Sequence, residues 1–412
     1  MSTTSIEKAY SMISATANNV STQSSRILSI DAFRGITFFL MIIVNELHGI
    51  SGISPWLKHM PADVDAMSFP DVVFPAFLFI VGMSIPFGRK TREHQGESTL
   101  QILRHIFGRA FALITMGFFM VNAESGFDES KMVISIALWS LLTYVAFILL
   151  WGVYRFDNPL WNRFGKLLGL MLLLSLAMIY RGDPNTPWMS IQWWGILGLI
   201  GWAYLLCSLL FFCTQRTSVL LAALLVCTGY YALSHSALNV QHRWFAIVLS
   251  QDAHAAHATI VLSGLVCSLI FFGKEKSTPI PTRFFQATLF ALILFAAATA
   301  LRPYYAISKI YATPSWCFYS ASACASFFAI LYYLIDIKGI QRWTGLFKPA
   351  AINPLVCYLI PFIIEAIYGI TGWLSPLHQL TGVLGIIACT AYAALILILV
   401  AVLNRFNFKM RF

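Results

Sequence analysis

The 412-residue sequence contains few charged residues: Asp, Glu, Lys and Arg make up 11% of it, against 58% hydrophobic residues. A soluble globular protein has about 25% charged and about 45–50% apolar residues. So little charge cannot cover a water-facing surface, which excludes a soluble enzyme and also a disordered chain. Residues 1–25 lack the apolar run of a cleaved signal peptide, so we expect a flexible polar tail followed by one domain over residues 26–412.

Metal-binding and disulfide patterns are also missing. The eight cysteines form no CxxC pair, so neither a zinc site nor a disulfide framework is indicated. His254 and His257 have the i, i+3 spacing of a helical metal pair, but no Cys or Glu accompanies them. We therefore expect no metal.

The apolar residues come in segments long enough to cross about 30 Å of hydrocarbon as helices. The sequence predicts an all-α polytopic membrane protein with about twelve spans, with eleven as the alternative count. The segments at 166–180 and 217–234 are the weakest. The twelve lie near residues 30–48, 71–88, 103–122, 132–153, 166–180, 193–213, 217–234, 257–272, 284–301, 316–336, 351–370 and 383–403.

Lys and Arg residues are distributed unevenly between the two sets of loops. Of the 27, 20 fall on the side of the N-terminus and six on the opposite side, and Arg34 lies inside the first span. Cytoplasmic loops collect Lys and Arg, so both termini are predicted to be cytoplasmic. The net charge of +10 thus reflects the Lys and Arg residues that cytoplasmic loops collect, and no nucleic-acid partner is expected.

Several polar residues lie in or beside the first two spans. Asp31 and Arg34 share a helix face and are either an ion pair at the cytoplasmic interface or part of a site wall. Asn45 closes the first span, His59 lies in the next loop, and Asp71 opens the second span. Because His suits general-base work near neutral pH, this block predicts a reactive site on the outer face.

Polar residues recur near the later spans. Lys309 and Trp316 belong to an outer loop that either anchors the interface or contacts an anionic substrate. Asn353 begins the eleventh span. Glu365 lies inside that span, where a carboxylate either has a functional role or reaches the interface.

These blocks resemble the heparan-α-glucosaminide N-acetyltransferase-like family. The resemblance is dense over residues 26–86 and sparse over about 300–360. The matching stretches are RILSIDAFRGIT from Arg26, MIIVN ending at Asn45, DVVFPAFLFIVGMSI from Asp71, SK at Ser308, TPSW from Thr313 and NPL from Asn353. The resemblance implies a membrane acetyltransferase that delivers acetyl from cytosolic acetyl-CoA to a sugar amine on the far side.

The family's reactive His corresponds to His59 and its Asn to Asn45, and Asp71 or Asp63 would orient the imidazole. Inner-side cations would hold the nucleotide end of CoA, because its phosphates cannot enter hydrocarbon cheaply; we expect Arg89, Lys90 and Arg92 there. The expected acceptor-binding residues are Asp31, Arg34, Asp63, Lys309, Trp316, Asn353 and Glu365.

The sequence departs from lysosomal members after His59. Those members continue with a small residue and Trp-Asn-Gly, whereas Met60, Pro61, Ala62 and Asp63 follow here, and the gap from Asn45 is longer. We therefore expect a bacterial branch in the cytoplasmic membrane, with an acceptor other than heparan sulfate. The sequence is compatible with a homodimer and does not decide the oligomeric state.

Two other functions stay open at this stage. A permease for amino sugars or oligosaccharides would also have twelve spans with both termini inside, but it should contain two similar halves, which the sequence lacks. A glycan O-acetyltransferase would use the same donor and yield an ester.

Overall fold

The computed structural model describes residues 27–154, 159–184, 186–236, 250–273 and 278–411; the predicted tail 1–25 lies outside this range. Within the described residues every regular element is helical, and β-type pairing is limited to three isolated bridges. The main helices are α2 (Leu28–Leu47), α3 (Pro70–His94), α4 (Thr99–Glu124), α5 (Ile136–Trp151), α6 (Pro159–Ile179), α7 (Gly195–Cys213), α8 (Thr217–Ser234), α11 (Asp252–Phe272), α12 (Ile280–Leu301), α13 (Pro314–Tyr332), α15 (Pro354–Thr371) and α16 (Gly382–Arg405).

Each predicted span corresponds to one of these helices, which confirms an all-α polytopic membrane protein. Eleven of the described helices are long and apolar enough to cross a membrane; the exception is α5, with 16 residues. The predicted span at 132–153 is therefore longer than the helix that forms there. The segment at 166–180, expected to be short, is instead part of the 21-residue helix α6. The apolar runs located the helices, but capping residues such as Ser135 set where α5 begins.

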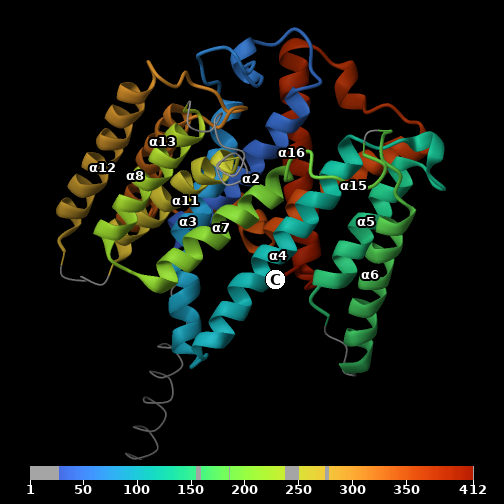
Figure 1. The fold of residues 1–412 in the computed structure, drawn as a ribbon, viewed down its shortest axis with the longest axis horizontal. Helices are drawn as coiled ribbons and strands as arrows, with labels where there is room; N and C mark the ends of the chain where they lie inside the picture. The colour runs from blue at the N-terminus through green and yellow to red at the C-terminus, as the bar shows by residue number, and fades with distance from the viewer. Residues whose placement is uncertain (1–26, 155–158, 185, 237–249, 274–277, 412) are drawn as a thin grey trace, which may run out of the picture.

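The loops gather at the two ends of the helix bundle (Figure 1). The blue loop after α2, which carries His59, and the orange loop after α12 lie at the upper end of the view. The turn between α3 and α4 lies at the lower end. We call these the His59 end and the arginine end, after the residues described below.

Close helix approach holds the centre of the fold together. Helices α3 and α11 pack so tightly that a Cβ on Gly82 would collide with the Val261 carbonyl oxygen. A Cβ on Gly264 would likewise collide with the Phe79 carbonyl oxygen. Small residues let helix backbones approach in membrane proteins, where dispersion contacts replace the hydrophobic effect. This packing holds α3, the helix whose first turn carries Asp71, against α11.

Candidate active site

His59 and Asp71 form a hydrogen-bonded pair at the His59 end. His59 Nδ1 lies 2.8 Å from Asp71 Oδ1. The Asp71 residue is 1% exposed, whereas 37% of the His59 side chain is exposed. The expected partner of His59 was either Asp63 or Asp71, and the structure places Asp71 against it. A buried carboxylate bonded to an accessible imidazole is an arrangement suited to general-base or nucleophilic work.

The Asp71 carboxylate is held by three further donors. Its Oδ2 accepts from the backbone N–H of Met60 at 3.2 Å, the backbone N–H of Ser68 at 3.1 Å and the Ser68 hydroxyl at 2.8 Å. Trp316 is fully buried and donates its indole N–H to the Asp71 carbonyl oxygen at 3.0 Å. Trp316, which we expected to contact the acceptor or the interface, therefore lies behind the pair and supports Asp71.

The loop between α12 and α13 is fastened to the loop that carries His59. Arg302 Nε donates to Asp65 Oδ2 at 2.9 Å, and the Ile307 N–H donates to Asp65 Oδ1 at 2.7 Å. The Ile307 N–H, with Arg302 adding to its effect, lowers the pKa of Asp65. Tyr311 donates its hydroxyl to Asp63 at 3.0 Å. These contacts join loops that lie far apart in the sequence.

Lys309, in the same loop, lies against the His59 ring. Its Nζ is 3.1 Å from Nδ1 and 3.2 Å from Nε2. The ammonium group is therefore nearly equidistant from the two ring nitrogens and is not aligned with the lone pair of either one. Burial lowers the pKa of Lys309 to about 8, an effect that the negative charge of Asp71 partly offsets. The structure thus places Lys309 beside the imidazole and outside the set of residues that line the adjoining cavity.

A cavity of about 650 Å³ opens beside His59, and Asn45 and Glu365 line it as well. Three of the residues singled out from the sequence are therefore brought together. Glu46 and Glu124 add two carboxylates to the same walls, and no Lys or Arg is among the described lining residues. Sequence reasoning had not assigned a role to Glu124; its position at the last residue of an apolar helix was the available signal.

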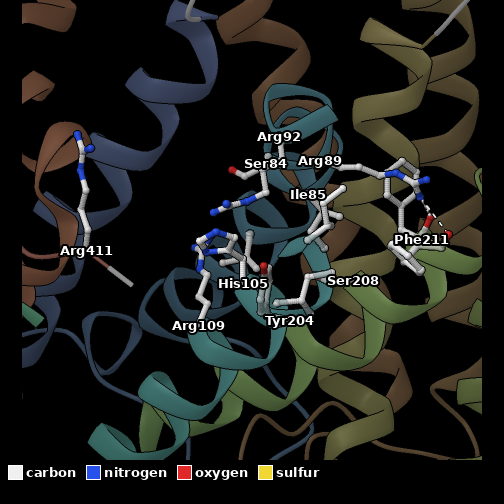
Figure 2. Close-up of a pocket in the computed structure, with 15 residues that line it drawn as sticks. Ser84, Ile85, Arg89, Arg92, His105, Arg109, Tyr204, Ser208, Phe211 and Arg411 are labelled. Atoms are coloured by element: carbon white, nitrogen blue, oxygen red, sulfur yellow. Dashed lines mark hydrogen bonds between the residues drawn. The ribbon is translucent and has the colours of Figure 1, made fainter. Parts of the chain in front are cut away.

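The opposite end contains a group of arginines. Arg89 and Arg92 line a cavity of about 270 Å³ together with His105 and Arg109 from α4 (Figure 2). Lys90, predicted alongside them, is not among its described lining residues. Arg34 pairs with Asp31 at 2.9 Å and lines a neighbouring cavity of about 350 Å³, which we call the middle cavity. Asp31 and Arg34 therefore lie at the arginine end, away from His59.

The three cavities adjoin one another through shared walls. Ser84 and Arg109 line both cavities at the arginine end. Leu197 and Tyr358 line both the middle cavity and the cavity beside His59. A series of adjoining cavities therefore leads from Arg89 at one end of the bundle to His59 at the other.

Asn353 does not join the His59 cavity. It is 1% exposed, and its amide contacts the backbone of residues 408 and 410. Among the described residues, no group of three or more His, Cys, Asp and Glu side chains could hold a metal ion. His254 lies instead beside the rings of Trp194 and Trp202.

The architecture and site define a polytopic membrane protein with a His–Asp pair at one end and clustered arginines at the other. A model of the family described as Domain of unknown function (DUF5009) matches residues 26–241, just over half of the chain. The chain belongs to this family, and it is also similar to heparan-alpha-glucosaminide N-acetyltransferases, the family that its sequence blocks resemble.

The human protein of that name is 38% identical over 98 residues, and the mouse protein is 35% identical over 100 residues. Each match covers 24% of this chain and 14% of the relative's length. The similarity thus covers only a small part of each relative.

Proposed function

We propose that this protein is a bacterial cytoplasmic-membrane acetyltransferase that moves acetyl from cytosolic acetyl-CoA to an amino sugar or amino-sugar-bearing glycan on the outer face. The observation that carries the proposal is the hydrogen-bonded His59–Asp71 pair, open to a cavity that Asn45 also lines. The names of the human and mouse relatives support N-acetyl transfer. The 20-to-6 distribution of Lys and Arg supports placing His59 on the outer side.

In this mechanism His59 is the base. A carboxylate only accepts hydrogen bonds, so Nδ1–H of His59 donates to Asp71 and Nε2 keeps its lone pair. The neutral acceptor amine attacks the thioester carbonyl carbon, a C–N bond forms, and the amine proton passes to Nε2. The C–S bond then breaks, and the departing sulfur takes that proton to give CoA. The Asn45 amide would donate to the carbonyl oxygen as negative charge develops there.

The charge of the His59 cavity supports an amine acceptor. Glu46, Glu124 and Glu365 line the cavity without a described Lys or Arg among the other lining residues. Carboxylates attract an ammonium group, which loses a proton to water before the neutral amine attacks, and they repel a sulfated glycan. This favours N-acetylation over O-acetylation, and a free or unsulfated amino sugar over heparan sulfate.

The test is acetyl transfer by purified protein in nanodiscs, with glucosamine and glucosamine-terminated oligosaccharides as acceptors. We expect His59→Ala to lose at least about 10²-fold in kcat, since it removes the base. His48→Ala is the matched control, because His48 lines the same cavity but is not in the His59–Asp71 pair. Full activity of His59→Ala would refute the assignment.

Two further measurements separate the alternatives. Mass spectrometry of the product distinguishes an amide from an ester. Uptake of labelled amino sugar into proteoliposomes that contain no acetyl-CoA would favour a permease instead. Acetyl label trapped on the protein without acceptor would indicate a covalent intermediate on His59 in place of direct transfer.

A further inference from the structure

Five arginines from different parts of the chain line the two adjoining cavities at the arginine end. They are Arg34 from α2, Arg89 and Arg92 from α3, Arg109 from α4, and Arg411. Figure 2 shows Arg411 on a separate segment, to the left of Arg92 and Arg109, and it lines the same cavity. Inner loops of membrane proteins are usually rich in Arg, but Arg34 and Arg109 lie well inside their helices.

The carboxylates in this region neutralise only part of that charge. Arg34 pairs with Asp31 at 2.9 Å, Arg89 with Glu93 at 2.7 Å and Arg92 with Glu97 at 3.1 Å. Among the described residues, neither Arg109 nor Arg411 has an ion-pair partner. Two positive charges therefore remain in excess.

Arg109 is the more constrained of these two residues. Its guanidinium carbon lies 4.7 Å from the centre of the Tyr204 ring, and its buried Nε has no hydrogen-bond partner among the described residues. A buried donor without a partner destabilises the protein unless a ligand supplies an acceptor. Phosphate oxygens are acceptors that match a guanidinium.

Arg411 is held at the cavity by a fastened segment, residues 406–411. The Val153 N–H donates to the Lys409 carbonyl at 2.8 Å, and the Arg411 N–H donates to the Trp151 carbonyl at 3.0 Å. The Asn353 amide donates to the Phe408 carbonyl at 2.8 Å and accepts from the Met410 N–H at 3.4 Å. Asn353 therefore fixes the backbone on both sides of residue 409.

We propose that the cavity of about 270 Å³ at the arginine end binds the phosphate groups of the donor. Arg109 and Arg411 are the phosphate-binding residues, and Asn353 is the residue that positions Arg411. The proposal rests on the proposed function for the identity of the donor, CoA. The neutral pantetheine arm would extend through the middle cavity towards Tyr358, which borders the His59 cavity. The phosphate of an anionic lipid headgroup has the same chemistry, so the test must separate the two sources.

The test measures binding of CoA and of pantetheine, which lacks the phosphates, to protein in nanodiscs of neutral lipid. We expect Arg109→Gln and Arg411→Gln each to weaken CoA binding at least about tenfold. Pantetheine binding should stay unchanged in both variants. Arg104→Gln is the matched control, since Arg104 lies on the same helix as Arg109 but outside both cavities. Thermal unfolding midpoints identify any variant that fails to fold.

Equal weakening of CoA and pantetheine by Arg411→Gln would overturn the proposal, because the arginine would then not act on the phosphates. Unchanged CoA affinity in both variants would overturn it as well. The same measurements are repeated in nanodiscs that contain phosphatidylglycerol. If the arginine variants changed CoA binding only in these nanodiscs, the arginines would act on a lipid headgroup, and the proposal would be overturned as well. CoA binding is independent of acetyl transfer. Binding that depends on the arginines, without transfer to any acceptor, would refute the proposed function and leave this site standing.

The positioning role of Asn353 has its own signature. Asn353→Ala should weaken CoA binding as much as Arg411→Gln does, and the double variant should be no weaker than either single variant, because both act through one side chain. Trypsin should also cleave at Arg405 or Lys409 faster in Asn353→Ala. Additive losses of CoA affinity would show that Asn353 acts elsewhere and would refute the positioning role.

Discussion

Replacing Asp71 by asparagine tests whether its carboxylate sets the working form of His59. Four donors converge on the two oxygens of Asp71: Oδ1 accepts from His59, and Oδ2 accepts from the Met60 N–H and from two groups of Ser68. An asparagine side chain has one oxygen and one NH₂ group, so it satisfies only one side of this arrangement. The three donors on the Oδ2 side outnumber His59 and should orient the amide oxygen.

The NH₂ group of the substituted side chain would then face His59 Nδ1 and donate to it. Nδ1 would have to accept, the proton would move to Nε2, and the lone pair that removes the amine proton would be lost. A wrong tautomer of this kind reduces rates by about 10²–10⁴-fold, or about 3–5 kcal/mol of transition-state stabilisation. We expect kcat to fall by this factor, with the free energy of unfolding lowered by only about 1–3 kcal/mol.

The assay is single-turnover acetyl transfer, with CoA binding and thermal unfolding measured on the same preparations. Asp63→Asn is the matched control, because Asp63 accepts from the Tyr311 hydroxyl and does not contact His59. That variant should keep kcat within about threefold of the wild type. If Asp71→Asn also stayed within about threefold, the carboxylate would not set the tautomer of His59, and the reasoning would be refuted.

Three other perturbations test the surroundings of the site. Burial lowers the pKa of Lys309 from 10.5 to about 8, so the unfolded chain binds more protons between these values, and the stability contributed by Lys309 increases with pH there. In thermal unfolding from pH 8 to pH 10, wild type should therefore gain stability relative to Lys309→Met; a constant difference would contradict this. Asp65→Asn should weaken the contacts of Asp65 with Arg302 and Ile307, which fasten the His59 loop to the loop between α12 and α13, and should lower kcat. Faster proteolysis between residues 51 and 69 is the check; unchanged proteolysis would show that these contacts do not hold the loop. Gly82→Ala should cost about 1–3 kcal/mol in unfolding measurements because its Cβ would meet the Val261 carbonyl oxygen, whereas Gly88→Ala, with open space around it, should be neutral or slightly stabilising; equal losses would disprove the close-approach argument.

The sequence by itself determined the helices. A run of apolar residues that must pair its own backbone groups in lipid has only one regular form, so α2 to α16 could be located within a few residues. The charge balance also supports an assignment of the two ends of the bundle. The pairing of His59 with a nearby carboxylate was expected as well, because Asp71 opens the helix that follows its loop.

Only the tertiary structure decided which distant residues meet. Nothing local in the sequence places Lys309 against His59, residues that are 250 positions apart. Glu124 reaches the His59 cavity because α4 ends beside that cavity. The sequence marked Trp316 and Asn353 as candidates for substrate contact. In the structure Trp316 supports Asp71, and Asn353 fastens residues 406–411. Helix formation depends on each segment's own composition, but a site depends on how helices pack, and packing is fixed by contacts such as the one between Gly82 and Val261.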